Sequence, residues 1–325
     1  MYYAPILIPT LCRYEHFVRC IESLRKNSWA RYTDVYIALD YPTKEEHTEG
    51  YEKILDYLKG EFKEFSKFIV IRRPYNYGAA KNMVDLRTDI LKKYDRFIRT
   101  DDDCEFSPNF IEYMDICLEK YKDDPNVLGV TGYSYPVQWK VSEGCNAFRN
   151  RAIFPMWGTG FWKDKFLEMQ NQIHGGCIKS AFVNGKIKRC KMTDARYIDV
   201  MNNVLKKDNL LYDFCDVACG CFIQINNKYV ITPVKSLVRN YGFDGSGIYC
   251  QNTINLKVRK KNASEYDYRK QEISENSNFE LKIDSQDYYK ENRVILNAFD
   301  KREKSIILKA IIKSKIYKIG LKGEL

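Results

Sequence analysis

The chain has 325 residues, of which 45% are hydrophobic and 14% aromatic, enough for a sizeable core in one large or two closely joined domains. Its formal net charge is +10, no apolar run approaches the roughly 20 residues that a membrane-spanning helix needs, and its start has no signal-peptide pattern. Eleven cysteines without a CxxC pair, beside only three histidines, argue for reduced thiols in a cytoplasm and against a structural zinc site.

Apolar runs and helical patterns alternate along the first hundred residues. The spacing predicts strands at 3–9, 35–39, 68–71 and 96–100. It predicts helices between them at 14–27, 51–65 and 79–92. Further along, we expect a helix at 108–121, a strand at 127–132 and a helix at 217–226. This alternation predicts an α/β fold with a doubly wound, mostly parallel sheet, in which ligands bind beyond the carboxyl ends of the strands.

Polar residues follow each of these four strands. They are 10–13, Asp40, 76–78 and the adjacent carboxylates Asp101, Asp102 and Asp103. Three neighbouring acids repel one another, and oxygen-rich sites suit Mg²⁺ and Mn²⁺, so the triplet indicates a divalent-metal site. The alternative is a solvated acidic turn before a helix, with Ser107 as N-cap and Pro108 as first helical residue.

Two common cofactor motifs are missing from the sequence. No GxGxxG follows the first strand and no GxxxxGK[ST] occurs, which disfavours a dinucleotide cofactor and excludes a P-loop. The aromatic run at 154–162 could line an acceptor pocket, because aromatic faces bind sugars well, or it could be a buried core turn.

The last 28 residues are strongly basic. From 298 to 325, eight Lys or Arg oppose three acids, which leaves +5, half of the net charge. Apolar side chains at Leu308, Ile312, Ile316 and Ile319 form a helical stripe between lysines. Such a basic amphipathic helix fits an anionic membrane surface, although packing on its own domain is an equal alternative. The chain has no RNA- or DNA-binding signature, so we expect no nucleic-acid partner.

The order and spacing of these motifs resemble GT-A glycosyltransferases. The resemblance is to bacterial family 2 sugar transferases of polysaccharide biosynthesis and to the N-acetylglucosaminyltransferase that starts complex N-glycans. The segments that carry it are 9–13, 37–40, 101–113, 154–160, 227–233 and 237–244. It implies a GT-A catalytic domain over 1–250, with a nucleotide-binding half at 1–105 and an acceptor-binding half at 106–250. A C-terminal extension at 251–325 would carry the basic helix.

The resemblance also implies a role for each acid at the strand ends. Asp103 would ligate Mn²⁺ or Mg²⁺ at the diphosphate of a nucleotide sugar, while Asp101 and Asp102 would contact ribose or hold metal-bound water. Asp40 would accept the imide N–H of uracil, which makes UDP the expected nucleotide.

Further residues complete the implied site. The other donor-binding residues would be Pro9, Thr10, Arg13, Asn76 and Lys81. The acceptor side would hold Trp157, Gly158 and Thr159. Related enzymes often carry a His shortly after the closing Gly-Phe segment, and this chain has Tyr249 or Cys250 there.

An inverting transfer needs a general base to take the proton of the acceptor hydroxyl. Counting back from Asn227, as in the bacterial relatives, leads to Asp216, with Asp213 and Asp194 as alternatives. Asp216 could also cap the helix that follows it.

Together these features predict a metal-dependent inverting glycosyltransferase. It would move a sugar from a UDP-sugar to a hydroxyl of a glycan or lipid-linked oligosaccharide in bacterial surface polysaccharide synthesis. We expect it in the cytoplasm, bound peripherally to the inner face of the cell membrane. The alternatives are a nucleotidyltransferase acting on a sugar phosphate and a catalytically inactive sugar- or lipid-binding scaffold.

Overall fold

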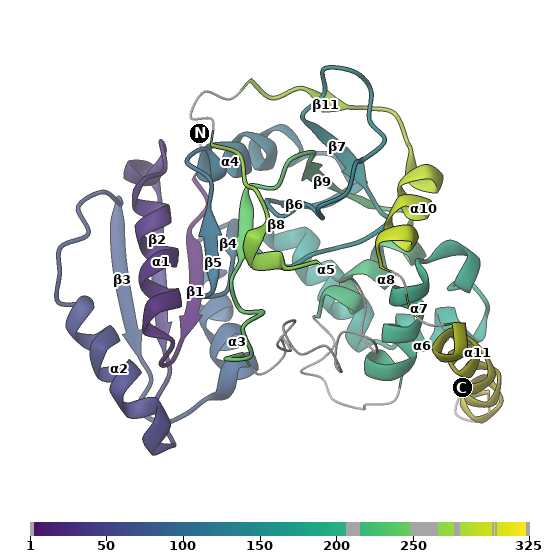
Figure 1. Ribbon diagram of the computed structural model, residues 1–325, viewed down its shortest axis with the longest axis horizontal. Coiled ribbons are helices and arrows are strands. Elements are labelled where there is room, and N and C mark those ends of the chain that lie inside the picture. Colours follow the sequence, from purple (N-terminus) through teal and green to yellow (C-terminus); the bar gives the residue numbers. More distant parts are fainter. Residues whose placement is uncertain are drawn as a thin grey trace.

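A nine-stranded mixed sheet forms the centre of the protein (Figure 1). The structure is a computed structural model that describes residues 3–205, 215–247, 266–275, 280–300, 302 and 304–322. In the order in which they pair, the strands are β11 (Ile283–Asp284), β7 (Ala147–Asn150), β9 (Tyr229–Pro233), β6 (Val127–Thr131), β8 (Thr159–Trp162), β4 (Arg96–Arg99), β1 (Ile6–Thr10), β2 (Asp34–Leu39) and β3 (Lys67–Arg72).

Most of the strand pairs are parallel, as the sequence predicts. β1, β2, β3 and β4 run parallel to one another, whereas β8 is antiparallel to both of its neighbours, and β7 is antiparallel to β9. A separate two-stranded ribbon joins β5 (Cys104–Phe106) to β10 (Val238–Asn240). The predicted α/β class and the strands expected up to residue 132 are confirmed to within a few residues.

Helices cover both faces of the sheet. They are α1 (Tyr14–Arg25), α2 (Glu45–Tyr57), α3 (Gly78–Ile90), α4 (Phe110–Lys120), α5 (Lys163–His174), α6 (Cys177–Val183), α7 (Asp194–Asp199), the π-helix η3 (Val200–Val204), α8 (Asp216–Asn226), α10 (Tyr289–Phe299) and α11 (Lys304–Leu321). Short 3₁₀ turns lie at η1 (Ala30–Tyr32), η2 (Arg189–Lys191) and η5 (Tyr268–Lys270).

The alternation of side chains along each strand explains the two helical layers. In β1, Ile6 and Ile8 join the core that holds α1, α2 and α4. Leu7, between them, joins the core that holds α3, α5, α6 and α8. The inner strands are therefore apolar on both faces, as expected for a parallel sheet covered by helices.

Two predicted helix starts are wrong. The helix expected at 51–65 begins at Glu45 and ends at Tyr57, and Glu45 and Glu46 lie in its first turn, where acids interact favourably with the helix dipole. The helix expected at 108–121 begins at Phe110 after Asn109. Ser107 is not its N-cap, because its hydroxyl contacts Asn109 and the carbonyl oxygen of Ser274 instead.

The described residues after 250 join the same body as the predicted catalytic domain. β11 pairs with β7 and extends the sheet. Asp284 accepts hydrogen bonds from the backbone N–H and hydroxyl of Ser142, and the Asn292 amide bonds both backbone groups of Lys140 at 2.8 and 3.1 Å. The segment predicted as an extension therefore helps to hold residues 140–148, in the half that is predicted to bind the acceptor.

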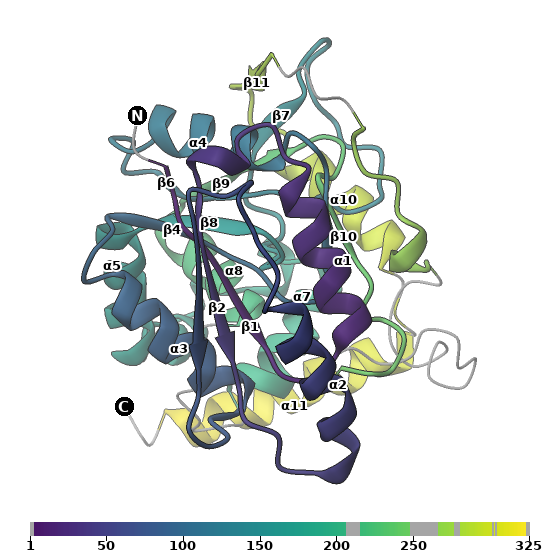
Figure 2. The ribbon, with the colours of Figure 1, turned by 90° about the vertical axis from the view of Figure 1, so that its left-hand side faces the viewer.

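α11 lies at the end of the molecule opposite the N-terminus (Figures 1 and 2). One face packs on the protein through buried Ala310, Ser314 and Leu321, and the Tyr317 hydroxyl donates to the carbonyl oxygen of Leu205. Among the described residues, no helix is both long and apolar enough to cross a membrane. The nine cysteines that the structure describes are free thiols.

A buried carboxyl group ties α4 to the first strand. Asp115 is completely buried, and its Oδ1 accepts the backbone N–H of Ala4 at 2.9 Å. Its other oxygen is buried without a hydrogen-bond partner. Burial raises the pKa of Asp115 to about 7.

We expect Asp115 to make the stability of the protein depend on pH. Because its pKa is higher in the folded state, its contribution is complete below about pH 4 and is lost as the pH rises through about 7, by on the order of 4 kcal/mol. Asp115→Asn removes this titration. In urea unfolding, the variant should therefore gain stability relative to wild type between pH 4.5 and pH 8. A difference between the two proteins that does not change with pH would contradict this.

Candidate functional site

The carboxyl ends of β1, β2 and β4 bring the predicted donor residues to one edge of the sheet. Thr10 ends β1, Asp40 follows β2, and the acidic triplet Asp101, Asp102 and Asp103 follows β4. β1 pairs with both β2 and β4, so the three groups lie on adjacent strands. The predicted convergence at this edge is confirmed.

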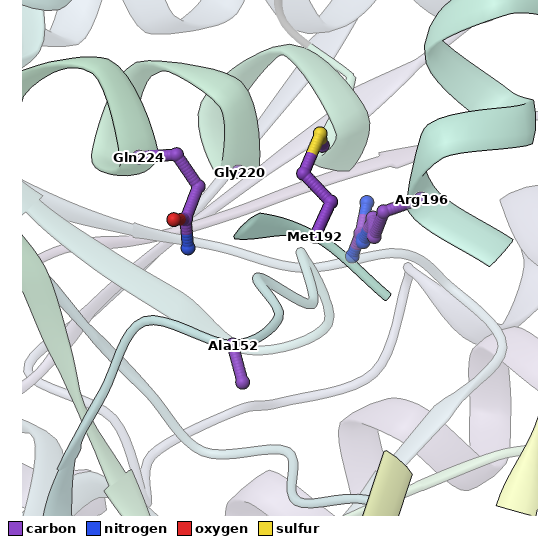
Figure 3. A pocket seen from close by; sticks show the side chains of 5 residues that line it. All are labelled: Ala152, Met192, Arg196, Gly220 and Gln224. Carbon is purple, nitrogen blue, oxygen red and sulfur yellow. The ribbon is translucent and has the colours of Figure 1, made fainter. Parts of the chain in front are cut away.

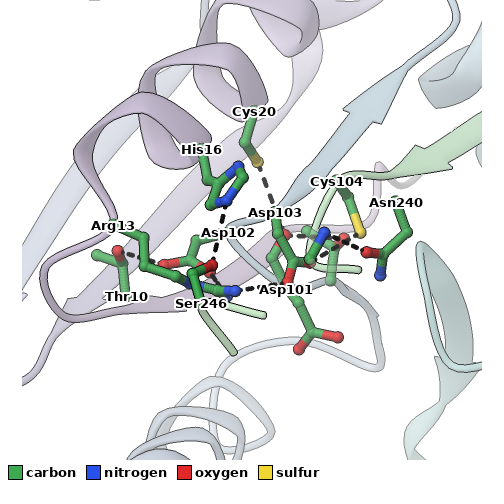
Figure 4. Close-up of polar contacts among 12 residues, drawn as sticks. Thr10, Arg13, His16, Cys20, Asp101, Asp102, Asp103, Cys104, Asn240 and Ser246 are labelled. Atoms are coloured by element: carbon green, nitrogen blue, oxygen red, sulfur yellow. Dashed lines mark hydrogen bonds and ion pairs between the residues drawn. The ribbon is translucent and has the colours of Figure 1, made fainter. Parts of the chain in front are cut away.

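Arg13 binds two carboxylates of the acidic triplet (Figure 4). Its Nη1 donates to Asp103 Oδ2 at 2.8 Å, and its Nη2 pairs with Asp102 Oδ1. Thr10 donates its hydroxyl to the other oxygen of Asp102 at 2.8 Å. Asp102 and Asp103 are almost completely buried, so these contacts take the place of water around the two acids.

Arg99 pairs with the third acid, Asp101, and its Nη1 donates to the carbonyl oxygen of Met156 at 3.1 Å. Burial raises the pKa of Asp103 to about 7, although the charge of Arg13 acts in the opposite direction. The triplet is thus an acidic centre that its two arginines neutralise only in part.

The segment after β10 closes the other side of the triplet. β10 pairs antiparallel with β5, and the backbone N–H of Tyr241 donates to the Asp103 carbonyl oxygen at 2.8 Å. Gly242 lies so near that a Cβ atom there would fall 2.1 Å from Asp103 Oδ2. The segment that resembles the closing part of GT-A enzymes therefore lies against the acids.

His16 is a site residue that the sequence reasoning missed. Its Nε2 lies 2.9 Å from Asp244 Oδ2 and 3.3 Å from the Ser246 hydroxyl (Figure 4). It is in the first turn of α1, three residues after Arg13, and this spacing could have indicated that both reach the same edge. Tyr249 and Cys250, the positions proposed in place of a histidine, lie outside the described residues.

The triplet in this arrangement does not fit a divalent metal. Five of its six carboxylate oxygens already contact Arg13, Arg99, Thr10 or the Cys104 thiol. In the described part of the chain, no three His, Cys, Asp or Glu side chains are grouped to hold a metal ion. The predicted ligand Asp103 has the Arg13 guanidinium as its cation instead.

The predicted nucleoside residues hold two turns together. Asp40 is buried and accepts the backbone N–H groups of Tyr41, Tyr77 and Gly78 at 2.7 to 2.9 Å. Asn76 donates to the carbonyl oxygen of Tyr41 at 2.6 Å. These bonds fix the edge beside β2, and the contact of Asp40 with a base stays a prediction.

The other donor-side predictions differ in their surroundings. Pro9 is partly buried within β1. Lys81 is exposed on α3, where it pairs with Asp85 and lies 4.2 Å from the centre of the Tyr77 ring. Its observed contacts are therefore on the surface of α3 and do not include the triplet.

The loop before β8 joins the acidic triplet to the predicted base. Arg99 donates to the Met156 carbonyl oxygen, and Arg196 donates to that of Phe154 at 2.9 Å. The Thr159 hydroxyl donates to Pro155 O at 3.0 Å, so this buried group is already bonded. Gly158 has φ +60°, which other residues rarely adopt, and its neighbours leave no room for a side chain.

Trp157 belongs to a group of aromatic rings that we call the aromatic group. Its indole lies 4.6 Å from Tyr133, 5.6 Å from Phe243 and 6.4 Å from Tyr268, measured between ring centroids. The other members, linked to these by ring contacts, are Tyr135, Tyr266 and Phe299. Three members come from beyond residue 250, and sequence reasoning missed them because no motif marks them.

Asp216 is the first residue of α8, and a buried arginine orients it. Arg196 Nη1 lies 3.5 Å from Asp216 Oδ2, while Oδ1 accepts the backbone N–H of Val217 at 3.0 Å. Burial acts to lower the pKa of Arg196, but Asp216 and the other acidic groups around it together raise that pKa, so the guanidinium stays charged. The N-cap is Cys215, so Asp216 does not cap the helix in the strict sense.

The Asp216 side chain is 44% exposed, so a substrate hydroxyl can reach it. A cavity of about 10 Å³ lies against Arg196, Met192, Gly220 and Gln224, and it has room for one water at most (Figure 3). This cavity is not a substrate pocket. Of the alternative bases, Asp194 pairs with Arg189 at 2.8 Å, and Asp213 lies outside the described residues.

A methyl group at Gly242 would collide with the Asp103 carboxylate. We expect Gly242→Ala to lower the free energy of unfolding by about 1–3 kcal/mol, because the acid or the closing segment must move. The control is Gly320→Ala in α11, where a Cβ meets nothing within 4 Å and alanine favours the helix. Thermal or urea unfolding measures both, and equal effects of the two substitutions would refute the close packing.

No protein-family model and no curated protein match the chain. Among solved structures it is similar to S. aureus TarS, with 9% identity, a TM-score of 0.41, and 74% of this chain and 37% of that one covered. TarS 1-349 in complex with UDP is 10% identical with a TM-score of 0.41, and the match covers 73% of this chain and 59% of that one. Mannosyltransferase PcManGT from Pyrobaculum calidifontis, in complex with GDP-Man and Mn²⁺, is 12% identical with a TM-score of 0.36. The match covers 50% of this chain and 45% of that one.

The chain spans less than two thirds of the length of each of these proteins. With TM-scores below 0.5, these similarities assign no function to the chain.

Proposed function

We propose that this protein is an inverting GT-A glycosyltransferase that moves a sugar from a UDP-sugar to a hydroxyl of a glycan or lipid-linked oligosaccharide. One observation carries the proposal. In the loop 154–158, the carbonyl oxygen of Met156 accepts from Arg99 beside the acidic triplet, and that of Phe154 accepts from Arg196 beside Asp216. The acidic triplet and an exposed carboxylate are thus both linked to one short loop.

The donor would lie along the carboxyl edge of β1, β2 and β4. Its uracil would lie beside Asp40, and its diphosphate near Arg13, whose guanidinium can bind phosphate oxygens with two parallel hydrogen bonds. Ser246, in the segment after β10, lies near the same end, because its hydroxyl is 3.3 Å from His16 Nε2. Mn²⁺ or Mg²⁺ would have to displace Arg13 from Asp102 and Asp103 before it could bind beside the diphosphate.

The acceptor would lie between Trp157 and Asp216. Partly exposed rings of the aromatic group offer apolar faces to a sugar. Asp216, oriented by Arg196, takes the proton of the acceptor hydroxyl, whose oxygen attacks the anomeric carbon from the side opposite the diphosphate. The new glycosidic bond forms as the bond from that carbon to the phosphate oxygen breaks, and UDP leaves with the electron pair.

A transferase with these roles should release UDP from one or more members of a UDP-sugar panel in the presence of Mn²⁺. We expect Asp216→Asn to lower transfer about 10²- to 10⁴-fold, because it removes the base, while UDP still raises the thermal unfolding temperature. Asp194→Asn is the control and should stay within a few-fold of wild type. Coupled detection of UDP measures each rate.

Other outcomes would select the alternative functions. UDP binding without transfer by wild type would favour an inactive scaffold. Formation of a nucleotide sugar from a nucleoside triphosphate and a sugar phosphate would favour a nucleotidyltransferase. If no nucleotide sugar is hydrolysed or stabilises the protein, the proposal is wrong.

We also propose that α11 binds an anionic membrane surface, at the inner face of the cell membrane in surface polysaccharide synthesis. Leu308, Ile312, Ile316 and Ile319 are 52 to 76% exposed, although they are large and apolar. From Lys304 to Leu321 the helix has five lysines and no acid, and Lys322 follows it directly. Apolar side chains flanked by lysines can enter the lipid surface while the lysines meet anionic headgroups.

The membrane contact predicts that Ile312→Asp with Ile316→Asp abolishes binding to vesicles with about one third phosphatidylglycerol. The matched control is Val294→Asp on α10. Val294 is 62% exposed, and its variant should bind vesicles like wild type. Wild type should bind vesicles of phosphatidylcholine alone at least tenfold more weakly. Vesicle sedimentation measures all three, and undiminished binding of the double variant would reject this role of α11.

A further inference from the structure

We infer that Arg13 is the resident cation of the Asp102–Asp103 pair, and that a divalent metal binds the free protein only in competition with this side chain. One guanidinium nitrogen pairs with each acid, and Thr10 takes the remaining oxygen of Asp102. A metal approaching these acids meets a cation already in place. This explains why oxygen ligands that suit Mn²⁺ form no metal site as arranged.

The charge balance favours such an exchange. Asp101 has its own partner, Arg99, so Asp102 and Asp103 share the single charge of Arg13. When both carboxyls are ionised, the pair with one guanidinium retains one negative charge, whereas a divalent ion would neutralise both. Arg13 therefore stabilises the two acids only in part. The acids still attract either a second cation or a cation with a higher charge than the guanidinium.

The position of Arg13 allows its side chain to leave while the backbone stays. It precedes α1 directly, and its carbonyl oxygen accepts the N–H of Phe17 at 2.9 Å in the first helical hydrogen bond. The side chain is 23% exposed, so one side of it reaches solvent. Rotation about its own bonds can turn the guanidinium away from the acids without disturbing the helix.

A nucleotide diphosphate would give the released guanidinium a new partner. This step rests on the proposed donor site. A phosphate that takes Arg13 frees the acids for the metal, and a metal that takes the acids frees Arg13 for the phosphate, so each ligand should strengthen the other. Arg13 is then a positioning residue that links the two binding events.

Mn²⁺ binding tests the inference without any measurement of activity. Free Mn²⁺ is titrated by electron paramagnetic resonance with wild type, Arg13→Met and, as the matched control, Arg25→Met, whose partners Glu22 and Glu64 lie outside the triplet. Without nucleotide, we expect Arg13→Met to bind Mn²⁺ at least tenfold more tightly than wild type and Arg25→Met to match wild type. Equal or weaker binding by Arg13→Met overturns the inference.

The same titration with UDP separates this inference from the proposed function. UDP should raise the Mn²⁺ affinity of wild type at least tenfold and that of Arg13→Met much less. If UDP binds no variant while Arg13→Met still binds Mn²⁺ more tightly, the donor site is wrong and the competition stands. If Arg13→Met does not fold, Arg13→Lys, which can reach only one acid at a time, must bind Mn²⁺ more tightly than wild type. Failure to do so overturns the competition.

Discussion

The burial of Asp102 and Asp103 is the constraint on which the rest of the site depends. Two acids away from water need donors and positive charge, and Thr10 at the end of β1 and Arg13 just before α1 supply them. The segment after β10 packs against Asp103 from another side, where the N–H of Tyr241 donates to its main-chain carbonyl oxygen and Gly242 lies against its carboxylate. Strands far apart in sequence are thus fixed around one charge, and that is where a diphosphate would lie.

The second organising feature is the loop 154–158. Its carbonyl groups are held by Arg99 on the side of the acids and by Arg196 on the side of Asp216. Through Arg196, which also lies 3.5 Å from Asp216 Oδ2, the loop is linked to the proposed base. The aromatic group lies along this loop through Trp157, and residues after 250 complete it.

Much of this arrangement follows from the sequence. The spacing of apolar residues predicts the strands and helices. Because the carboxyl ends of parallel strands meet at one edge of the sheet, it also predicts that Thr10, Asp40 and the triplet lie together. The remainder depends on contacts between distant segments. His16 meets Asp244 across 228 positions, and Tyr268 stacks on Phe243, which no local pattern encodes. Arg13 is predicted at a phosphate, and in the structure it pairs with the buried acids Asp102 and Asp103.

The most direct measurement of the central claim is a crystal structure of the protein with UDP and Mn²⁺. The account predicts uracil beside Asp40, the diphosphate between Arg13 and the acidic triplet, and the guanidinium of Arg13 turned from the acids toward phosphate. UDP bound away from this edge, or a diphosphate at the edge with Arg13 still paired to Asp102 and Asp103 beside bound Mn²⁺, would contradict it.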